Sequence, residues 1–221
     1  MSRTNRYPAF LLVVILILST TFANAQTDFG LWGGFELSKK VSDDLRFGFK
    51  GNLRFDDNAS SYRLSYLQLS LQYRPYKWMR ASLGSRAVWR DKFNANGDRL
   101  FANMTFIRKW HKRLRTRYRL QYQLDRDTNT EWAMAENGVR HKLSTSWRKK
   151  KTDFTWNFGT EFFYSWDGRG GDWDKYRLFF GTSYQINKRQ TIGIDYIFQS
   201  ELNSGNDKIN IIALEYSLQL K

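Results

Sequence analysis

The chain has no cysteine, only two prolines and only two histidines among its 221 residues. The lack of cysteine excludes a disulfide scaffold and metal sites built on thiolates. Its apolar run Ala9–Leu18 is too short to cross a bilayer as a helix, which needs about 20 residues. By contrast, 17% of the residues are aromatic and the formal net charge is +15. Nine tryptophans exclude a disordered basic tail, and the length suits one large domain.

The first 25 residues have the pattern of a secretory signal peptide. Arg3 and Arg6 precede the apolar run, and Ala23-Asn24-Ala25 forms a small-residue cleavage site. We therefore expect residues 1–25 to be removed after export and residues 26–221 to form a single domain. Export from the cytoplasm argues against a nucleic-acid partner, so we expect none and the high positive charge needs another explanation.

Apolar and polar residues alternate through the remaining chain in eleven segments of roughly 10 to 14 positions. In one of them, Phe47, Phe49 and Leu53 share a face, and the basic residues between them share the other. A period of two is the signature of a β-strand with one apolar and one polar face. No segment has a helical period, so the pattern predicts an all-β antiparallel meander of long hairpins.

Two barrel architectures produce this alternation. A soluble barrel points its apolar face inward, whereas an outer-membrane barrel points it toward lipid and encloses a polar lumen. Segments of this length match the roughly 9 to 11 residues that cross a bilayer at a tilt. Aromatic residues also gather at both sets of strand ends, as the two girdles of a membrane barrel do. These residues are Tyr73, Tyr76, Trp78, Trp110, Trp147 and Tyr184 at one set, and Trp89, Trp166 and Tyr176 at the other.

The connections between the segments also favour the membrane barrel. Short basic turns such as 108–113, with a charge of +4, alternate with acidic and generally longer loops such as 167–174, with a charge of −2. Short periplasmic turns that alternate with longer external loops define the up-and-down plan. We predict a transmembrane barrel, monomeric, in the outer membrane of a Gram-negative bacterium, surrounded by outer-membrane lipid and lipopolysaccharide.

The number of strands does not follow directly from the segments. Eleven is odd, whereas bacterial single-chain barrels have an even number of strands. We therefore predict 10 or 12 strands. In that case a strand near the amino terminus is split or missed, or the first segment, Phe29–Leu37, tucks into the lumen.

The polar face of the strands is rich in arginine and lysine, which would line the lumen. The basic candidates are Arg46, Lys50, Arg54, Arg80, Arg86, Arg90, Arg115, Arg117, Arg119, Arg140, Lys142 and Arg177. Their expected acidic partners are Glu136, Asp153, Glu161, Asp195 and Glu215. We expect these charges to pair and fill the lumen, so that the barrel is structural. If they leave a bore, rings of arginine favour small anions or acidic oligosaccharides, as in the architecturally similar small porins for acidic oligosaccharides.

Short motifs near the start of the mature chain carry a resemblance to a known family. They are Trp32 and Glu36, the Lys39-Lys40 turn, and Leu45 to Asp57 with its Leu53-Arg54-Phe55-Asp56-Asp57-Asn58 end. They resemble the small outer-membrane barrels of Bacteroidota-type bacteria known as domain of unknown function twenty-four-ninety. The resemblance implies the fold and the location, and it implies no catalytic residue. Many outer-membrane barrels end in an aromatic residue that helps the barrel-assembly machinery, whereas this chain ends in Leu220-Lys221.

A second function class is a membrane-embedded lipid hydrolase. Such an enzyme needs a serine and a histidine close together on the lipid-facing surface. His141 and Ser144 differ by three positions, which places them on opposite faces of a strand, and His111 lies in a turn. We therefore expect no enzyme. The acidic loops do not match a calcium-binding loop, so we also expect no metal and no cofactor.

Overall fold

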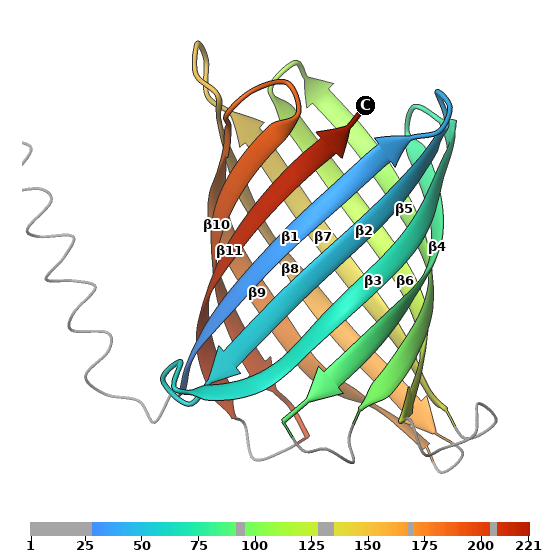
Figure 1. Ribbon diagram of the computed structural model, residues 1–221, viewed down its shortest axis with the longest axis vertical. Helices are drawn as coiled ribbons and strands as arrows, with labels where there is room; N and C mark the ends of the chain where they lie inside the picture. Colours follow the sequence, from blue (N-terminus) through green and yellow to red (C-terminus); the bar gives the residue numbers. More distant parts are fainter. Residues whose placement is uncertain (1–27, 92–95, 128–134, 168–169, 204–206) are drawn as a thin grey trace, which may run out of the picture.

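The computed structural model describes residues 28–91, 96–127, 135–167, 170–203 and 207–221, so the predicted signal peptide lies outside the described residues. The described part is a sheet of eleven long strands (Figure 1). They are β1 (Asp28–Lys40), β2 (Leu45–Asp56), β3 (Ser61–Tyr76), β4 (Met79–Arg90), β5 (Gly97–His111), β6 (Leu114–Asp127), β7 (Glu136–Arg148), β8 (Phe154–Asp167), β9 (Gly170–Gln185), β10 (Gln190–Glu201) and β11 (Lys208–Leu220). None of the described residues forms a helix long and apolar enough to span a bilayer.

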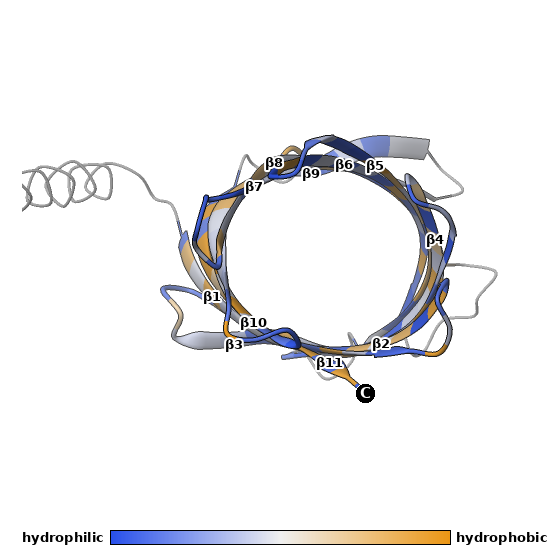
Figure 2. Ribbon diagram, turned by 90° about the horizontal axis from the view of Figure 1, so that it is seen from above, coloured by the Kyte–Doolittle hydropathy of each residue, from blue (hydrophilic) through white to orange (hydrophobic). Residues whose placement is uncertain are grey.

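Each strand pairs antiparallel with the next, and β1 pairs with β11 to close the sheet into a barrel. Seen from above, the strands form one ring (Figure 2). The prediction of an all-β, up-and-down barrel is confirmed. We name the two ends by their connections. The turn end carries the β1–β2, β3–β4, β5–β6, β7–β8 and β9–β10 turns and the carboxyl terminus, and the loop end carries the other connections.

The predicted count of 10 or 12 strands is wrong, because the barrel has eleven. In an up-and-down meander, an odd count leaves the first and last strands running in the same direction. β1 and β11 therefore pair in parallel, from Asp28 opposite Ile209 to Lys39 opposite Leu220 (Figure 1). The segment Phe29–Leu37 is thus a strand of the wall and does not tuck into the lumen. Closure by a parallel pair satisfies both edges of the sheet.

The alternation of residues places the apolar face outside. On β3, Leu67, Leu69 and Leu71 are 42–47% exposed, whereas Tyr66 on the other face is 5% exposed. The interior has only a small apolar cluster, in which Trp32 of β1 packs with Ile209 and Ile211 of β11. This is the reverse of a soluble barrel, in which apolar residues fill the centre.

Aromatic side chains stand exposed at both ends of the outer face. At the turn end, Tyr76 and Trp78 stack with their ring centroids 5.4 Å apart, and Trp110 is 61% exposed. At the loop end, Trp89 and Trp173 are 42% and 45% exposed. Rings with a polar atom prefer the headgroup level of a bilayer, so the outer face has the polarity profile of a membrane barrel.

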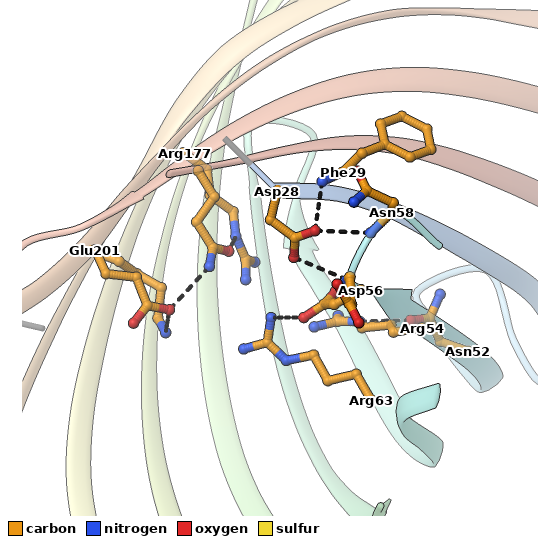
Figure 3. A network of polar contacts seen from close by, with 12 residues as sticks. Asp28, Phe29, Asn52, Arg54, Asp56, Asn58, Arg63, Arg177 and Glu201 are labelled. Atoms are coloured by element: carbon orange, nitrogen blue, oxygen red, sulfur yellow. Dashed lines mark hydrogen bonds and ion pairs between the residues drawn. The ribbon is translucent and has the colours of Figure 1, made fainter. Parts of the chain in front are cut away.

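The β2–β3 connection fastens β1 at the loop end. Asp57, Asn58 and Ala59 all have positive φ, at 54°, 55° and 61°. The carboxylate of Asp28 accepts hydrogen bonds from the backbone N–H groups of Asp57 and Asn58, at 3.0 Å and 2.9 Å (Figure 3). These bonds hold a backbone conformation that costs non-glycine residues energy, and they tie the first residue of β1 to the next hairpin.

The parallel closure can be tested by a crosslink, because the chain has no cysteine of its own. Gly33→Cys with Leu214→Cys places two thiols at positions that pair in the register of β1 with β11. Neighbouring strands lie about 4.8 Å apart, within reach of a disulfide. We expect oxidation to form the crosslink in the folded barrel, visible as a mobility change in a non-reducing denaturing gel.

The control is Gly33→Cys with Leu220→Cys, because Leu220 lies opposite Lys39, six positions further along β1. Six residues correspond to about 20 Å along a strand, so this pair should stay reduced. A folded barrel that crosslinks the control pair, or fails to crosslink the register pair, would contradict the parallel closure.

Candidate functional site

One cavity of about 1120 Å³ occupies the interior of the barrel, and every strand contributes to its wall. Its lining reaches from Gln72 and Ser217 near the turn end to Asp127 and Asp174 near the loop end. Among the residues that the structure describes, fourteen Lys or Arg and nine Asp or Glu side chains line it, an excess of five positive charges. The candidate site is therefore the lumen itself.

Most of the basic candidates from the sequence lie in this wall. Ten of the twelve line the cavity: Lys50, Arg54, Arg80, Arg86, Arg90, Arg117, Arg119, Arg140, Lys142 and Arg177. Arg46 and Arg115 occupy the same strand faces closer to the turn end and are not part of the lining. They lie in the mouth of the barrel, where Arg46 and Arg115 are among the charged groups that act on Arg80.

Four of the five acidic candidates also line the cavity: Glu136, Glu161, Asp195 and Glu215. Asp153 does not belong to the lumen. It precedes the start of β8 at Phe154, so the alternation of that strand does not extend to it, and it lies in the basic turn with Lys149, Lys150 and Lys151. Several lining charges near the loop end lie outside the predicted set, including Arg63, Arg99 and Lys175.

A layer of stacked guanidinium groups and aromatic rings narrows the middle of the lumen. Arg54 lies 3.8 Å from the ring of Trp32, Arg86 lies 4.0 Å from Tyr66, and Arg140 lies 4.4 Å from Phe163. Arg177 joins the two sides, at 5.0 Å from Trp32 and 4.7 Å from Phe163. With the acid Glu161 and its partner Arg119, we call this layer the belt: Trp32, Arg54, Tyr66, Arg86, Arg119, Arg140, Glu161, Phe163 and Arg177.

Stacking on a ring covers the flat face of a guanidinium and fixes its orientation. The N–H groups at its edge then point along the lumen or toward a polar neighbour. Arg86, for example, donates two hydrogen bonds to the amide oxygen of Gln68, at 3.1 Å and 2.6 Å. Arg177 donates to the amide oxygen of Gln199 at 2.7 Å. Rings and amide oxygens thus hold the guanidinium groups of the belt in place.

Glu161 is the acid at the centre of the belt. Its Oε1 accepts hydrogen bonds from Arg119 at 2.7 Å and Arg140 at 2.8 Å, and its Oε2 lies 3.9 Å from Arg177. The Glu161 side chain is only 5% exposed. One buried carboxylate therefore holds three guanidinium groups that come from β6, β7 and β9.

The loop end of the lumen is neutralised by pairs. Arg63 forms an ion pair with Asp56 at 2.5 Å (Figure 3). Arg126 pairs with Asp98 at 2.6 Å, and Arg99 makes a bidentate contact with Asp125. Planar carboxylates match the fork of arginine, so these pairs fix the side chains at this mouth. Few positive charges remain exposed to a solute there.

The lumen between the belt and the turns has a different character, and we call this part the chamber. Small residues line it on nearly every strand: Gly48, Ser70, Ser82, Asn103, Ser144, Asn157, Ser183, Gly193 and Ser217. Arg80 stands in it, and the four charged groups that act on Arg80 most strongly are also arginines: Arg46, Arg117, Arg115 and Arg74. The chamber is therefore wider and less neutralised than the loop end.

The histidine and serine considered for lipid hydrolysis lie on opposite sides of the wall. The Nδ1 atom of His141 lies 2.7 Å from the hydroxyl of Tyr118 on the outer face, whereas Ser144 lines the cavity. His111 accepts a hydrogen bond from the backbone N–H of Arg113 in the β5–β6 turn. Within the described ranges, no three His, Asp or Glu side chains are grouped to hold a metal ion.

A closed barrel with an apolar outer face and a charged interior is porin-like. Among solved structures, the chain is similar to the NanC porin, with a TM-score of 0.52 at 12% identity over 82% of this chain and 93% of that one. This likeness concerns the fold. The chain belongs to the family described as Protein of unknown function (DUF2490), whose model matches residues 29–210. No functionally curated protein matches the sequence.

Proposed function

We propose that this protein is an outer-membrane channel that lets small anions diffuse through its lumen. The observation that carries the proposal is the cavity of about 1120 Å³. Its lining extends toward both ends of the strands, and the described lining residues have an excess of five positive charges. At roughly 30 Å³ for each water molecule, such a volume has room for several tens of waters, which supports an open lumen. Rings of arginine favour anions over cations.

The proposed location rests on the outer surface and the signal-peptide pattern. The exposed apolar face and the two aromatic girdles suit lipid and lipopolysaccharide, and the basic turns suit the periplasmic side. A monomer that the barrel-assembly machinery inserts is sufficient for this role. The proposal requires no cofactor and no catalytic step. It is favoured over a solid structural barrel because small residues, and not large ones, line the chamber.

The experiment is single-channel recording of the refolded protein in a planar bilayer under a KCl gradient. We expect discrete opening steps in the current. The reversal potential should be shifted from zero toward the equilibrium potential of chloride. Arg80→Glu with Arg117→Glu should lower the chloride-to-potassium permeability ratio on the order of tenfold, because four units of charge change inside a confined lumen.

The matched control is Lys149→Glu with Lys151→Glu, which makes the same change of charge in the β7–β8 turn, outside the lumen. This control should alter selectivity little, because salt screens exposed charges. A correctly folded wild-type barrel that shows no conductance, or that prefers potassium, would refute the proposed function.

A further inference from the structure

The charges of the chamber are separated onto two arcs of the barrel, which meet where β1 pairs with β2. Four cations line it, Lys50, Arg80, Arg117 and Lys142, and all of them lie on strands between β2 and β7. Three acids line it, Glu36, Asp195 and Glu215, and all of them lie on β1, β10 and β11. An electric field therefore crosses the chamber from the first arc to the second.

Some of these charged groups already have partners in the barrel wall. Lys50 makes an ion pair with Glu215 across β1. In the described part of the chain, Glu36 and Asp195 make no hydrogen bond and no ion pair. On the other arc, Arg117 donates to the hydroxyl of Ser146 at 2.7 Å, and Lys142 lies 4.2 Å from the ring of Phe179. Arg117 and Arg80 make no ion pair with a carboxylate among the described residues, whereas Lys142 lies opposite Glu161 in the β7–β8 register and interacts with its charge.

Backbone packing keeps Asp195 against the wall. Its neighbour across the β9–β10 pair is Gly181, where a Cβ atom would overlap the Asp195 carboxylate. The carboxylate lies in the space that this glycine leaves, so it occupies a defined place and leaves the chamber open. The charged groups that act on it are Lys142, Glu215 and Lys50. Lys142 acts on Asp195 from β7, two strands beyond its neighbour β9, whereas Lys50 on β2 borders the acidic strands and pairs with Glu215.

We infer that the chamber is a binding site for small zwitterions, solutes that carry both an anionic group and a protonated amine. The amine faces Asp195 and Glu36, and the anionic group faces Arg80 and Arg117. A simple anion is attracted by one arc and repelled by the other, whereas a zwitterion gains from both when it lies across the lumen. Passage of such solutes rests on the proposed function, but binding in the chamber does not.

The test compares 4-aminobutyrate with butyrate, which has the same chain length and carboxylate but no amine. Isothermal titration calorimetry on the refolded barrel in detergent should give an affinity for 4-aminobutyrate about fivefold higher than for butyrate. Glu36→Gln with Asp195→Asn should remove that difference by weakening 4-aminobutyrate binding, and butyrate binding should stay the same or improve.

The matched control is Glu136→Gln with Asp174→Asn, which removes two lining carboxylates at the loop end of the cavity. It should keep the fivefold preference. The heat-dependent mobility of each variant in a detergent gel shows that it is folded. Equal affinities in the wild type, no binding of either ligand, or an unchanged preference in the Glu36 and Asp195 double variant would each overturn the inference.

The same proteins separate this inference from the proposed function. A channel that prefers chloride but does not distinguish the two ligands overturns the inference alone. A barrel without conductance that binds 4-aminobutyrate through Glu36 and Asp195 overturns the proposed function alone.

Discussion

Glu161→Gln is expected to lower the free energy of unfolding by about 3 kcal/mol, because it leaves a cluster of buried cations without their carboxylate. Oε1 of Glu161 accepts from Arg119 at 2.7 Å and Arg140 at 2.8 Å, and Arg177 lies 3.9 Å from Oε2. Glutamine has nearly the same shape, so packing is preserved and the lost charge dominates. Urea titration of the barrel in lipid vesicles, followed by tryptophan fluorescence, measures the change.

Two comparisons sharpen this prediction. Glu136→Gln removes a lining acid that is exposed at the loop end, and it should change stability little. Glu161→Gln with Arg140→Met removes an acid and one of its cations together, and it should recover part of the loss, since a buried pair replaced as a unit is better tolerated. If Glu161→Gln unfolds at the wild-type urea concentration, the carboxylate does not hold the belt together.

Local periodicity was sufficient to predict the faces of the strands. Leu67, Leu69 and Leu71 are outside and Tyr66 is inside, because a period of two fixes the face of each residue once the strand is known. The prediction of strand faces fails where the alternation of residues is interrupted. Asp153 lies one residue before β8, and β-bulges at Arg54/Phe55 and Phe163/Tyr164 shift the alternation near the loop end.

The closure of the barrel could not be predicted in the same way. Eleven segments were visible in the sequence, but no local pattern shows which strands pair across the two ends of the chain. Bacterial single-chain barrels have an even number of strands, and for this reason 10 or 12 strands were predicted although the sequence has eleven segments. The parallel register of β1 with β11 pairs Asp28 with Ile209, which lie 181 positions apart in the sequence.

The partners within the belt also depend on the closed structure. Glu161 on β8 meets Arg119 on β6 and Arg177 on β9, so its partners come from both sides. Trp32 of β1 reaches Arg177 of β9 across two intervening strands. Strand tilt and stagger set these heights in a barrel, and the sequence pattern of a single strand contains neither. The sequence therefore predicted most of the charges that line the lumen but not which of them meet.

Trp32→Ala is the second change with a large expected effect, because this residue belongs both to the apolar cluster and to the belt. Its side chain is 6% exposed and packs with Ile209 and Ile211 of β11. Its ring also holds Arg54 at 3.8 Å and Arg177 at 5.0 Å. Truncation of a buried tryptophan costs about 3 to 5 kcal/mol, and we expect this loss in the free energy of unfolding.

Trp32→Ala should also widen the lumen at the level of the belt. Without the ring, Arg54 and Arg177 lose the surface that fixes them, and the space of the indole joins the cavity, so single-channel conductance should rise while the preference for chloride remains. Trp89→Ala is the control, because Trp89 is 42% exposed on the outer face and should leave conductance unchanged. An unchanged conductance in a folded Trp32→Ala barrel would mean that the narrowest point of the path lies elsewhere. In that case the arginine mouth around Arg80 at the turn end would be the next place to test.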